Sequence, residues 1–499
     1  MCIRDSPNLD LTSGFTFLGQ FVDHDITFDT TTLDLQQSDP DATKNFRTPR
    51  YDLDSIYGLG PNYNPQFYDP SDRDKFWIWS DDYSDITGIL KIGNDFVDGT
   101  WPVKSDTVYD VPRSSDGTAT IADPRNDQTL IILQLHVAFQ MFHNKLVDIM
   151  RSNGIPRSAV FESARRLARW HYQWIVTHQF LPAIVGQALS DSVYKEVKDK
   201  APVINIKYYK PTNPAGRAFI PVEFAVAAYR FGHSITRPRY TVRDVLKPDG
   251  SSLGSVSSVP LFPNAPGGNN LTGHRDLLSL PRLKIQWNRF FNDKKFDPAT
   301  SKWNDVYTAR PVRQFDASLA DALFDMPATA LPDANTLGKL SQRNLQRGRK
   351  MGLPSGQKVA KLMGVTPLTN AQLSQNHRIR VHVPIVGNKV QLEAPPEGGP
   401  AEYNEPNTQL AGLFSNSGWG GEAPLWFYIL KEAEIVGKGR TLGPVGGRIV
   451  AEVLVGLLQR DPNSYLYLNP SWKPAPPIAP ARGQFTMADL LKFAGAWPK

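Results

Sequence analysis

"FLGQFVDHDITFD", residues 17–29, is the most informative stretch of this sequence. His24 stands between Asp23 and Asp25, and Gln20 precedes it by four residues in an otherwise apolar segment. Successive side chains of a helical turn point in different directions, so these polar residues must serve at least two sites. One carboxylate can face a metal ion while the imidazole faces another group.

A second segment, "RTPRYDLDSIYG" (47–58), adds oxygen ligands for such an ion. Every second residue from 48 to 54 is a candidate, and an extended loop would direct these residues to one side. The candidates are Thr48, Arg50, Asp52 and Asp54, the first two through their backbone carbonyls. With Asp25 they would form an anionic, all-oxygen shell, which suits Ca²⁺ better than Mg²⁺ or a transition metal. Taken alone, a loop of this kind is more often a solvated Asp-rich turn.

A third segment, "AAYRFGHSITRP", places His233 on a helix expected to start near Pro221. Gly232 removes a side chain beside the imidazole, as a flat ligand approaching the helix would require. Haem iron commonly takes a helical histidine as its axial ligand, although an isolated helical histidine is more often structural. Four others, His136, His143, His171 and His178, form pairs seven residues apart, and we interpret them as hydrogen-bonded packing residues.

Composition narrows the class of protein. The chain has 499 residues, of which 40% are hydrophobic and 21% charged, as in a folded globular protein. The longest apolar run, 129–142, is interrupted by polar residues, so no transmembrane segment is expected. The net charge of +6 is spread along the chain, which argues against nucleic acid as a partner. Cys2 is the single cysteine, which excludes intramolecular disulfides and thiolate metal cages.

The start of the chain, "MCIRDS", lacks the apolar core of a signal peptide, so residues 1–13 are expected to be an incomplete or artefactual N-terminus. One thiol permits folding on either side of a membrane, and we favour a secreted or extracytoplasmic location.

Periodicity predicts a mainly α fold. Helices are expected at 127–151, 158–186, from Pro221, and more weakly at 316–328, 356–363, 423–436 and 443–460, with a last short helix after the Pro-rich stretch 470–481. Loops are expected at 30–125, a strand at 377–387, and surface insertions or linkers at 260–273 and 393–406.

Two further motifs carry polar residues suited to a reaction site. "DPRNDQT" (123–129) contains Arg125 before a helix, and "QRNLQRGR" (342–349) contains Asn344, Arg347 and Arg349. An arginine beside a histidine, with no acid partner evident in the sequence, suggests stabilisation of developing negative charge. An asparagine can accept a histidine Nδ1–H and fix its tautomer.

In order, "GQFVDHD", "TPRYDLDSIYG", "DPRND", "HNKL", "YRFGH", "RNLQRGR" and "GLP" resemble the motifs of the animal-type haem peroxidases. This family is the peroxidase–cyclooxygenase superfamily, and the likeness is greatest to its bacterial members. It covers roughly residues 14–460. The resemblance implies one large helical domain, residues 14–499, with long loops and little β structure around a single haem b.

The resemblance also assigns roles to residues. It implies that His24 is the distal acid–base residue, that Gln20 and Arg125 share its cavity, and that His233 is the axial ligand of the haem iron. Asn344 would lie behind His233, with Arg230 and Arg347 also at the cofactor. The calcium ligands would be Asp25, Thr48, Arg50, Asp52 and Asp54. Asp23 matches a carboxylate that forms an ester with a haem methyl group, whereas Gln128 and Thr129 stand where other members form two further links.

The implied activity is that of a haem-dependent peroxidase. Hydrogen peroxide would be reduced with proton transfer through His24, and an oxyferryl intermediate would then oxidise small donors such as phenols, halides or thiocyanate. One alternative is a haem fatty-acid dioxygenase of the same superfamily. Those enzymes place a radical-forming tyrosine three residues before the proximal histidine, where this chain has Arg230, with Tyr229 one residue earlier. The other alternative is a non-catalytic extracellular module that binds calcium or haem.

Overall fold

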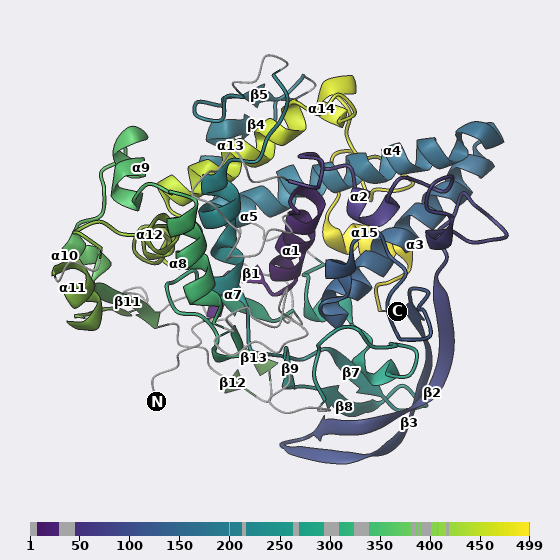
Figure 1. Cartoon of the computed structure of the whole chain (residues 1–499). Helices are drawn as coiled ribbons and strands as arrows, with labels where there is room; N and C mark the ends of the chain where they lie inside the picture. The colour runs from purple at the N-terminus through teal and green to yellow at the C-terminus, as the bar shows by residue number, and fades with distance from the viewer. Residues whose placement is uncertain are drawn as a thin grey trace.

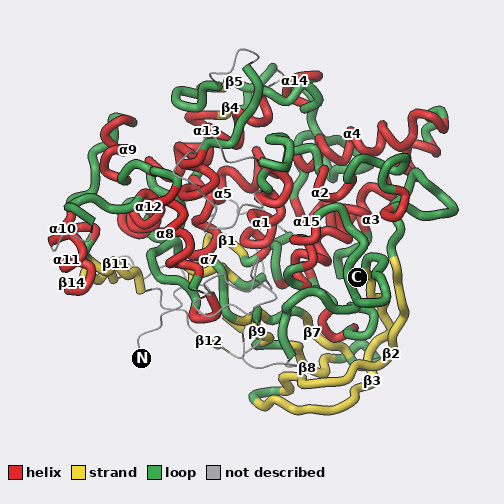
Figure 2. The backbone as a smooth tube through the Cα atoms, in the orientation of Figure 1, coloured by secondary structure: helices red, strands yellow, loops and turns green. Residues whose placement is uncertain are grey.

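Most elements in the described part of this chain are helices, as the sequence predicts (Figure 1). Their buried apolar side chains form a hydrophobic core. The computed structural model describes residues 7–28, 45–198, 200–211, 216–262, 269–293, 309–323, 339–380, 385–386, 389–390, 401–406, 408–415 and 419–498. Figure 2 shows helices through the body and strands gathered mainly in the sheet that contains β2 and β3. Among the described helices, none has the length and apolar character needed to cross a bilayer.

Three helices form the centre: α1 (Gly14–Ile26), α3 (Leu130–Ser152) and α4 (Arg157–Ile175). Phe21 of α1 stacks on Phe139 of α3 with ring centroids 4.6 Å apart, and Tyr172 of α4 meets both rings edge-on. Such contacts add to the burial of large apolar surfaces. The close entry of α1 requires Gly14, because a Cβ there would lie 2.6 Å from the Phe290 carbonyl oxygen. Helix α1 is therefore fixed in the core at its first residue.

Two predicted helices are present but contain irregular turns. α4 continues through a π-helix (Val176–Phe180) into α5 (Leu181–Val185), which confirms the helix expected at 158–186. After Pro221 the chain forms a π-helix, η5 (Glu223–Ala227), a 3₁₀-helix, η6 (Ala228–Phe231), and α7 (Gly232–Ile235). The segment is helical where predicted, although it is not a regular α-helix. Departures of this kind are frequent near functional sites.

Four of the remaining helices confirm predicted ones: α9 (Gly356–Leu362), α12 (Leu425–Ile435), α13 (Pro444–Gln459) and α15 (Met487–Ala494). Helix α8 (Leu340–Lys350) was not predicted. The short helices that were not predicted are α2 (Asp54–Tyr57), η2 (Pro65–Phe67), η3 (Pro124–Asp127), α6 (Gln187–Val193), η7 (Pro281–Leu283), η8 (Trp287–Arg289), α10 (Asn370–Leu373), α11 (Thr408–Ser415) and α14 (Tyr465–Leu468).

The helix expected at 316–328 is largely wrong within the described residues. Only a 3₁₀ turn, η9 (Asp321–Leu323), is present there, and residues 324–328 lie outside the described part of the chain. The Asp316 carboxylate accepts a hydrogen bond from the Ser318 backbone N–H at 2.8 Å. Such a bond competes with helix formation, because it satisfies the backbone locally.

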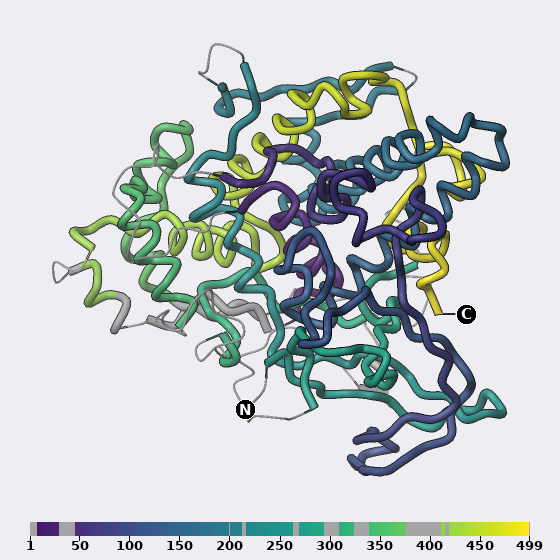
Figure 3. Tube along the Cα trace, turned by 45° about the vertical axis from the view of Figure 1, so that its right-hand side comes forward, coloured from purple at the N-terminus to yellow at the C-terminus, as the bar shows by residue number. Residues whose placement is uncertain are grey.

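The prediction of loops at 30–125 is also partly wrong, because a long hairpin occupies 79–110. Residues 29–44 lie outside the described part of the chain. Strands β2 (Trp79–Ile92) and β3 (Asp95–Asp110) join at Gly93 and Asn94, and Gly93 has a φ of 61°. Apolar residues on one face are buried between exposed aspartates, the pattern of a half-solvated antiparallel sheet. The sheet order is β3-β2-β8-β7, with β7 at Arg243–Leu246 and β8 at Ser252–Val256. Figure 3 shows the hairpin extending away from the helical body.

Smaller strand pairs lie elsewhere. β1 (Pro7–Thr12) pairs with β10 (Pro311–Arg313), and β6 (Arg239–Tyr240) with β9 (Val259–Pro260). β4 (Tyr194–Lys195) pairs with β5 (Val203–Ile204), and β12 (Ile385–Val386) with β13 (Lys389–Val390). The strand expected at 377–387 begins as β11 (Gln375–Arg380), which pairs with β14 (Ala401–Pro406) inside a predicted linker. The other parts of that linker, and 263–268 of the insertion at 260–273, lie outside the described residues.

Candidate active site and metal site

The buried His24 is held by an asparagine that the sequence analysis did not single out. His24 is 4% exposed, and its Nδ1 lies 2.8 Å from Oδ1 of the fully buried Asn126 in η3. An amide oxygen only accepts, so this contact places the His24 proton on Nδ1 and leaves Nε2 free to accept a proton. The signal was present in "DPRND", one residue beyond Arg125.

The other end of the same amide contacts a second buried histidine. Asn126 Nδ2 lies 3.1 Å from His136 Nδ1. His136 therefore packs as predicted, directly behind the group that orients His24. The other three make packing contacts: His143 with the Tyr57 hydroxyl, His171 with the Leu167 carbonyl, and His178 with Glu196.

Arg125 does have an acid partner, contrary to the sequence-based expectation. Its Nε donates to Asp123 Oδ1 at 3.0 Å and its Nη2 to Asp123 Oδ2 at 2.7 Å. Nη2 also donates to the His24 backbone carbonyl at 2.9 Å, and the guanidinium lies 4.5 Å from the Phe28 ring centroid. Asp123 caps η3 by accepting from the Arg125 backbone N–H at 3.0 Å. One carboxylate thus caps the turn and orients the arginine against α1.

Burial favours the neutral form of His24, although the charges of Asp123 and Asp23 raise its pKa. Burial, and then the positive charge of Arg125, lower the pKa of His24 from 6.5 to about 4. Although burial works in the opposite direction, Arg125, His24 and Arg47 hold the pKa of Asp123 below its ordinary value. At neutral pH the site holds a neutral imidazole beside a paired arginine and aspartate.

The half-buried His233 of α7 is also contacted by an amide. Asn344 Nδ2 of α8 lies 2.9 Å from His233 Nδ1. In this orientation the amide nitrogen faces the ring. A 180° turn about the Cβ–Cγ bond, which exchanges two atoms of similar size, would present Oδ1 and leave Nε2 free to bind a metal. Burial, then Arg230 and Arg343, lower the pKa of His233 to about 3, so it is neutral at pH 7.

Open space lies beside this histidine. A Cβ placed on Gly232 would meet no atom within 4 Å. Helix α7 contacts α1, so the two histidine segments adjoin. An open backbone face beside a neutral imidazole fits a flat, iron-bearing ligand such as haem.

The other residues predicted at a cofactor lie on the same elements. Gln20 and Asp23 of α1 are half-buried, and Asp23 Oδ1 accepts from the Thr27 hydroxyl at 2.9 Å. Arg230 Nε donates to the Ala225 carbonyl at 2.8 Å, and Arg347 follows Asn344 by three residues on α8.

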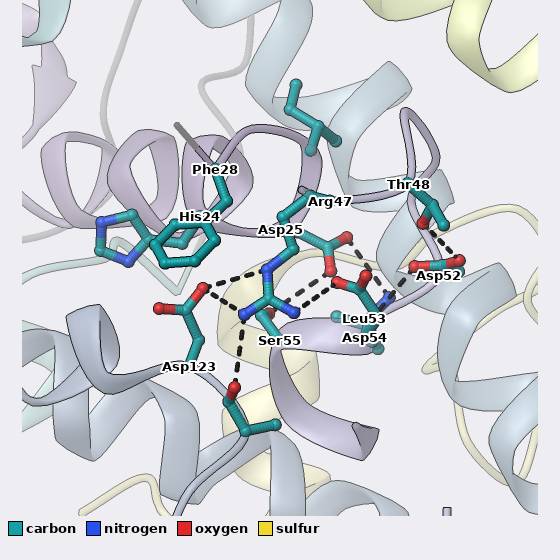
Figure 4. Close-up of polar contacts among 12 residues, drawn as sticks. His24, Asp25, Phe28, Arg47, Thr48, Asp52, Leu53, Asp54, Ser55 and Asp123 are labelled. Carbon is teal, nitrogen blue, oxygen red and sulfur yellow. Dashed lines mark hydrogen bonds and ion pairs between the residues drawn. The ribbon is translucent and has the colours of Figure 1, made fainter. Parts of the chain in front are cut away.

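The predicted metal ligands do meet. One carboxylate oxygen from each of Asp25, Asp52 and Asp54 lies within 4.8 Å of the others, and the Thr48 hydroxyl donates to Asp52 Oδ2 at 2.8 Å (Figure 4). Leu53 between the two loop aspartates has a φ of 55°, and its backbone N–H donates to Asp25 Oδ2 at 3.3 Å. A bulky residue with positive φ is strained, so the surrounding structure must impose this loop shape.

The cluster carries more negative charge than its contacts compensate. Burial, then Asp54 and Asp52, raise the pKa of Asp25, and burial, then Asp52, raise the pKa of Asp54 to about 7. Asp54 Oδ1 is buried without a hydrogen bond, and Arg47 Nη1 lies 3.4 Å from it. Crowded carboxylates with raised pKa values fit a hard cation such as Ca²⁺. The Arg50 side chain lies outside the cluster, 3.9 Å from Asp461, so only its backbone could contribute the ligand predicted from it.

Sequence comparison with known proteins gives a match to one family and to distant relatives. The sequence model of a family described as "Animal haem peroxidase" matches residues 36–380, a span that starts after His24. Chorion peroxidase of Drosophila melanogaster is 24% identical over 286 residues, which cover 56% of this chain and 30% of that protein. The matches span 26% to 33% of the length of the curated relatives.

Two solved structures share the fold. Peroxidase A from Dictyostelium discoideum has a TM-score of 0.55 at 16% identity, covering 92% of this chain and 81% of that one. The fatty acid alpha-dioxygenase of Oryza sativa has a TM-score of 0.56 at 11% identity, covering 94% and 73%.

Proposed function

The chain belongs to the animal haem peroxidase family, and we propose that it is a haem peroxidase that reduces hydrogen peroxide and oxidises small donors. Phenols, halides and thiocyanate are the donor classes that we expect. Membership of the family implies haem, and the open face at Gly232 beside His233 is compatible with it.

One observation carries the proposal: two neutral histidines on adjoining helices each have an amide against Nδ1. The contacts are His24 with Asn126 at 2.8 Å and His233 with Asn344 at 2.9 Å. The His24 contact places the ring proton on Nδ1, and the Asn344 amide would do the same for His233 once turned to present Oδ1. A free Nε2 is required for proton transfer on one side and for metal binding on the other.

Haem bound to His233 would supply the redox-active iron at which the peroxide O–O bond is reduced. His24 would take a proton from one peroxide oxygen at Nε2 and return it to the departing oxygen. Asn126 would keep the Nδ1 proton in place during both transfers. Arg125 uses Nε and Nη2 for Asp123 and His24, and we propose that its Nη1 faces the developing negative charge.

Calcium at Asp25, Thr48, Arg50, Asp52 and Asp54 would fix the loop 47–58 to α1. Asp25 directly follows His24, so an ion there would hold the imidazole at a set height. Asp23, on the other side of His24, would be the carboxylate that links to a haem methyl group.

Haem reconstitution of two variants tests the proposal. His233→Ala should lose the Soret band and retain no haem after gel filtration, whereas His24→Ala should retain haem and lose at least about a hundredfold in peroxide reactivity. His274→Asn is the matched control, because asparagine tolerates the positive φ of 58° at that exposed position. An unchanged Soret spectrum in His233→Ala would show that the axial assignment is wrong.

A further inference from the structure

Arg47 lies between carboxylates that belong to two different parts of the site. Its Nη2 donates to Asp123 Oδ2 at 2.5 Å and its Nε to the same oxygen at 3.2 Å. On its other side, Nη1 lies 3.4 Å from Asp54 Oδ1 in the acidic cluster. Figure 4 shows the guanidinium between the two carboxylates.

These two carboxylates are the charged partners of Arg47 among the described residues. Its side chain is 12% exposed, and within that part of the chain it also contacts the Ala122 carbonyl at 3.4 Å and the face of Phe28 at 5.6 Å from the ring centroid. Burial acts against a charged guanidinium, and the negative charges of Asp123 and Asp54 offset that cost. The arginine is therefore shared between two acids.

The second acid connects Arg47 to the reaction site. Asp123 Oδ2 accepts from Arg47 and also from Arg125 Nη2 at 2.7 Å. Arg125 in turn donates to the backbone carbonyl of His24 at 2.9 Å. A continuous line of charged contacts thus runs from the acidic cluster, through Arg47 and Asp123, to Arg125 and the helix that carries His24.

We propose that Arg47 is a positioning residue that couples cation binding at Asp25, Asp52 and Asp54 to the placement of Arg125. Without a cation, the crowded carboxylates attract Arg47 away from Asp123. A bound divalent cation neutralises the cluster and leaves Arg47 with Asp123, which then holds Arg125 against α1. The proposal deepens the proposed function, on which its last step depends.

Calcium affinity provides the first test, because substitutions of Arg47 and of Asp123 should change it in opposite directions. Arg47→Gln removes a positive charge beside the cluster and should tighten calcium binding roughly fivefold. Asp123→Asn, which lies outside the cluster, releases Arg47 toward Asp54 and should weaken binding by a similar factor. Chelator-treated protein would be titrated with CaCl₂ by calorimetry, with circular dichroism confirming folding.

Arg151→Gln and Asp72→Asn are matched controls. They remove the same charges from another ion pair, which has a 2.7 Å contact. Neither residue of this pair contacts the acidic cluster among the described residues, so calcium affinity should stay unchanged. Arg47→Lys retains the charge and should stay within about twofold of wild type. Equal shifts of the same sign in Arg47→Gln and Asp123→Asn would overturn the proposal, as would wild-type protein that binds no calcium.

Cyanide binding to the haem-loaded protein tests the connection to Arg125. In the wild type, calcium should tighten cyanide binding several-fold, because an oriented arginine favours the anion, and in Arg47→Gln this dependence should disappear. A calcium effect of equal size in both proteins would overturn the coupling. The calcium titration needs neither haem nor turnover, so failure of the peroxidase proposal, seen as no Soret band, remains distinguishable from failure of this one.

Discussion

At the scale of single residues, Asn126 determines which nitrogen of His24 can accept a proton. It makes two contacts at once, with His24 at 2.8 Å and with His136 at 3.1 Å. Because each contact uses a different atom of the amide, the two histidines fix its orientation together. A sequence pattern could suggest an asparagine near the site, but not that it links two histidines ten residues and more than a hundred residues away.

The pH dependence of the peroxide reaction should report this contact. With the pKa of His24 lowered to about 4, the rate constant should be flat near neutral pH and fall on acidification with a midpoint near pH 4. Between the unfolded pKa of 6.5 and the folded value, the unfolded chain binds more protons, so the contribution of His24 to stability also decreases as pH falls. Stopped-flow measurements with peroxide would give the profile.

Asn126→Asp supplies the matched variant. A carboxylate at Nδ1 favours the imidazolium, so the midpoint should move upward by about one pH unit or more. Asn126→Leu should instead lower the rate constant at all pH values, because the tautomer is no longer selected. An unshifted midpoint in Asn126→Asp would contradict the role assigned to the amide.

Asp23 is the residue to test for a covalent link to haem. Gln128 and Thr129 cannot form the other links known in the family, so a single ester is expected. After peroxide treatment and acid denaturation, mass spectrometry should find haem on the peptide that contains Asp23 and lose it in Asp23→Ala. Haem that extracts completely would show that no link forms, and a crosslink on the Gln128 peptide would contradict the assignment.

At the scale of elements, the loop 47–58 was predictable and its connections were not. Alternating oxygen-bearing residues identified Asp52 and Asp54 because their spacing is local. The pairing of Arg47 with Asp123 joins residues 76 positions apart and depends on how η3 packs against α1. The error over Arg125 has a different cause: its partner Asp123 is only two residues before it, and the pair forms because Asp123 also caps η3, a turn that was not predicted.

Asp52→Asn should have opposite effects on stability with and without calcium. In metal-free protein the substitution removes repulsion among carboxylates, so the melting temperature should stay the same or rise. In saturating calcium it removes a ligand, so the calcium-dependent rise in melting temperature should fall by at least half. Thermal unfolding in EGTA and in CaCl₂ measures both. Equal calcium stabilisation in the two proteins would exclude Asp52 from the site.

The segment 223–235 bears on the fatty-acid dioxygenase alternative. Arg230 stands where a radical-forming tyrosine would be, and the buried Tyr229 donates its hydroxyl proton to the Gly19 carbonyl at 3.2 Å. We therefore expect no efficient oxygen uptake with linoleate, and no change in Tyr229→Phe. Oxygen electrode measurements would decide, and rapid uptake that disappears in Tyr229→Phe would favour the dioxygenase instead.

At the scale of the whole molecule, the long apolar helices could be predicted because the hydrophobic periodicity that indicates each helix lies within its own residues. α3 is buried on nearly all sides and α13 likewise, and both lie within a few residues of their expected bounds. The hairpin 79–110 was not recognised, because its aspartates resemble loop composition until the two strands are paired. Pairing between strands is information that local periodicity does not contain.

The arrangement of the molecule predicts which regions haem should stabilise. The proposed haem contacts come from α1, the segment 223–235 and α8, which are more than a hundred residues apart in sequence and adjoin in space. If haem binds only the folded chain, a free haem concentration of 100 times its Kd should raise the free energy of unfolding by about 2.7 kcal/mol. Hydrogen exchange should therefore slow in these three elements together when haem is added, while the tip of the hairpin β2–β3 exchanges as before. Asn344→Ala should reduce the protection, and His233→Ala should abolish it. Protection limited to one element, or equal protection of the hairpin tip, would show that haem does not bind between these helices.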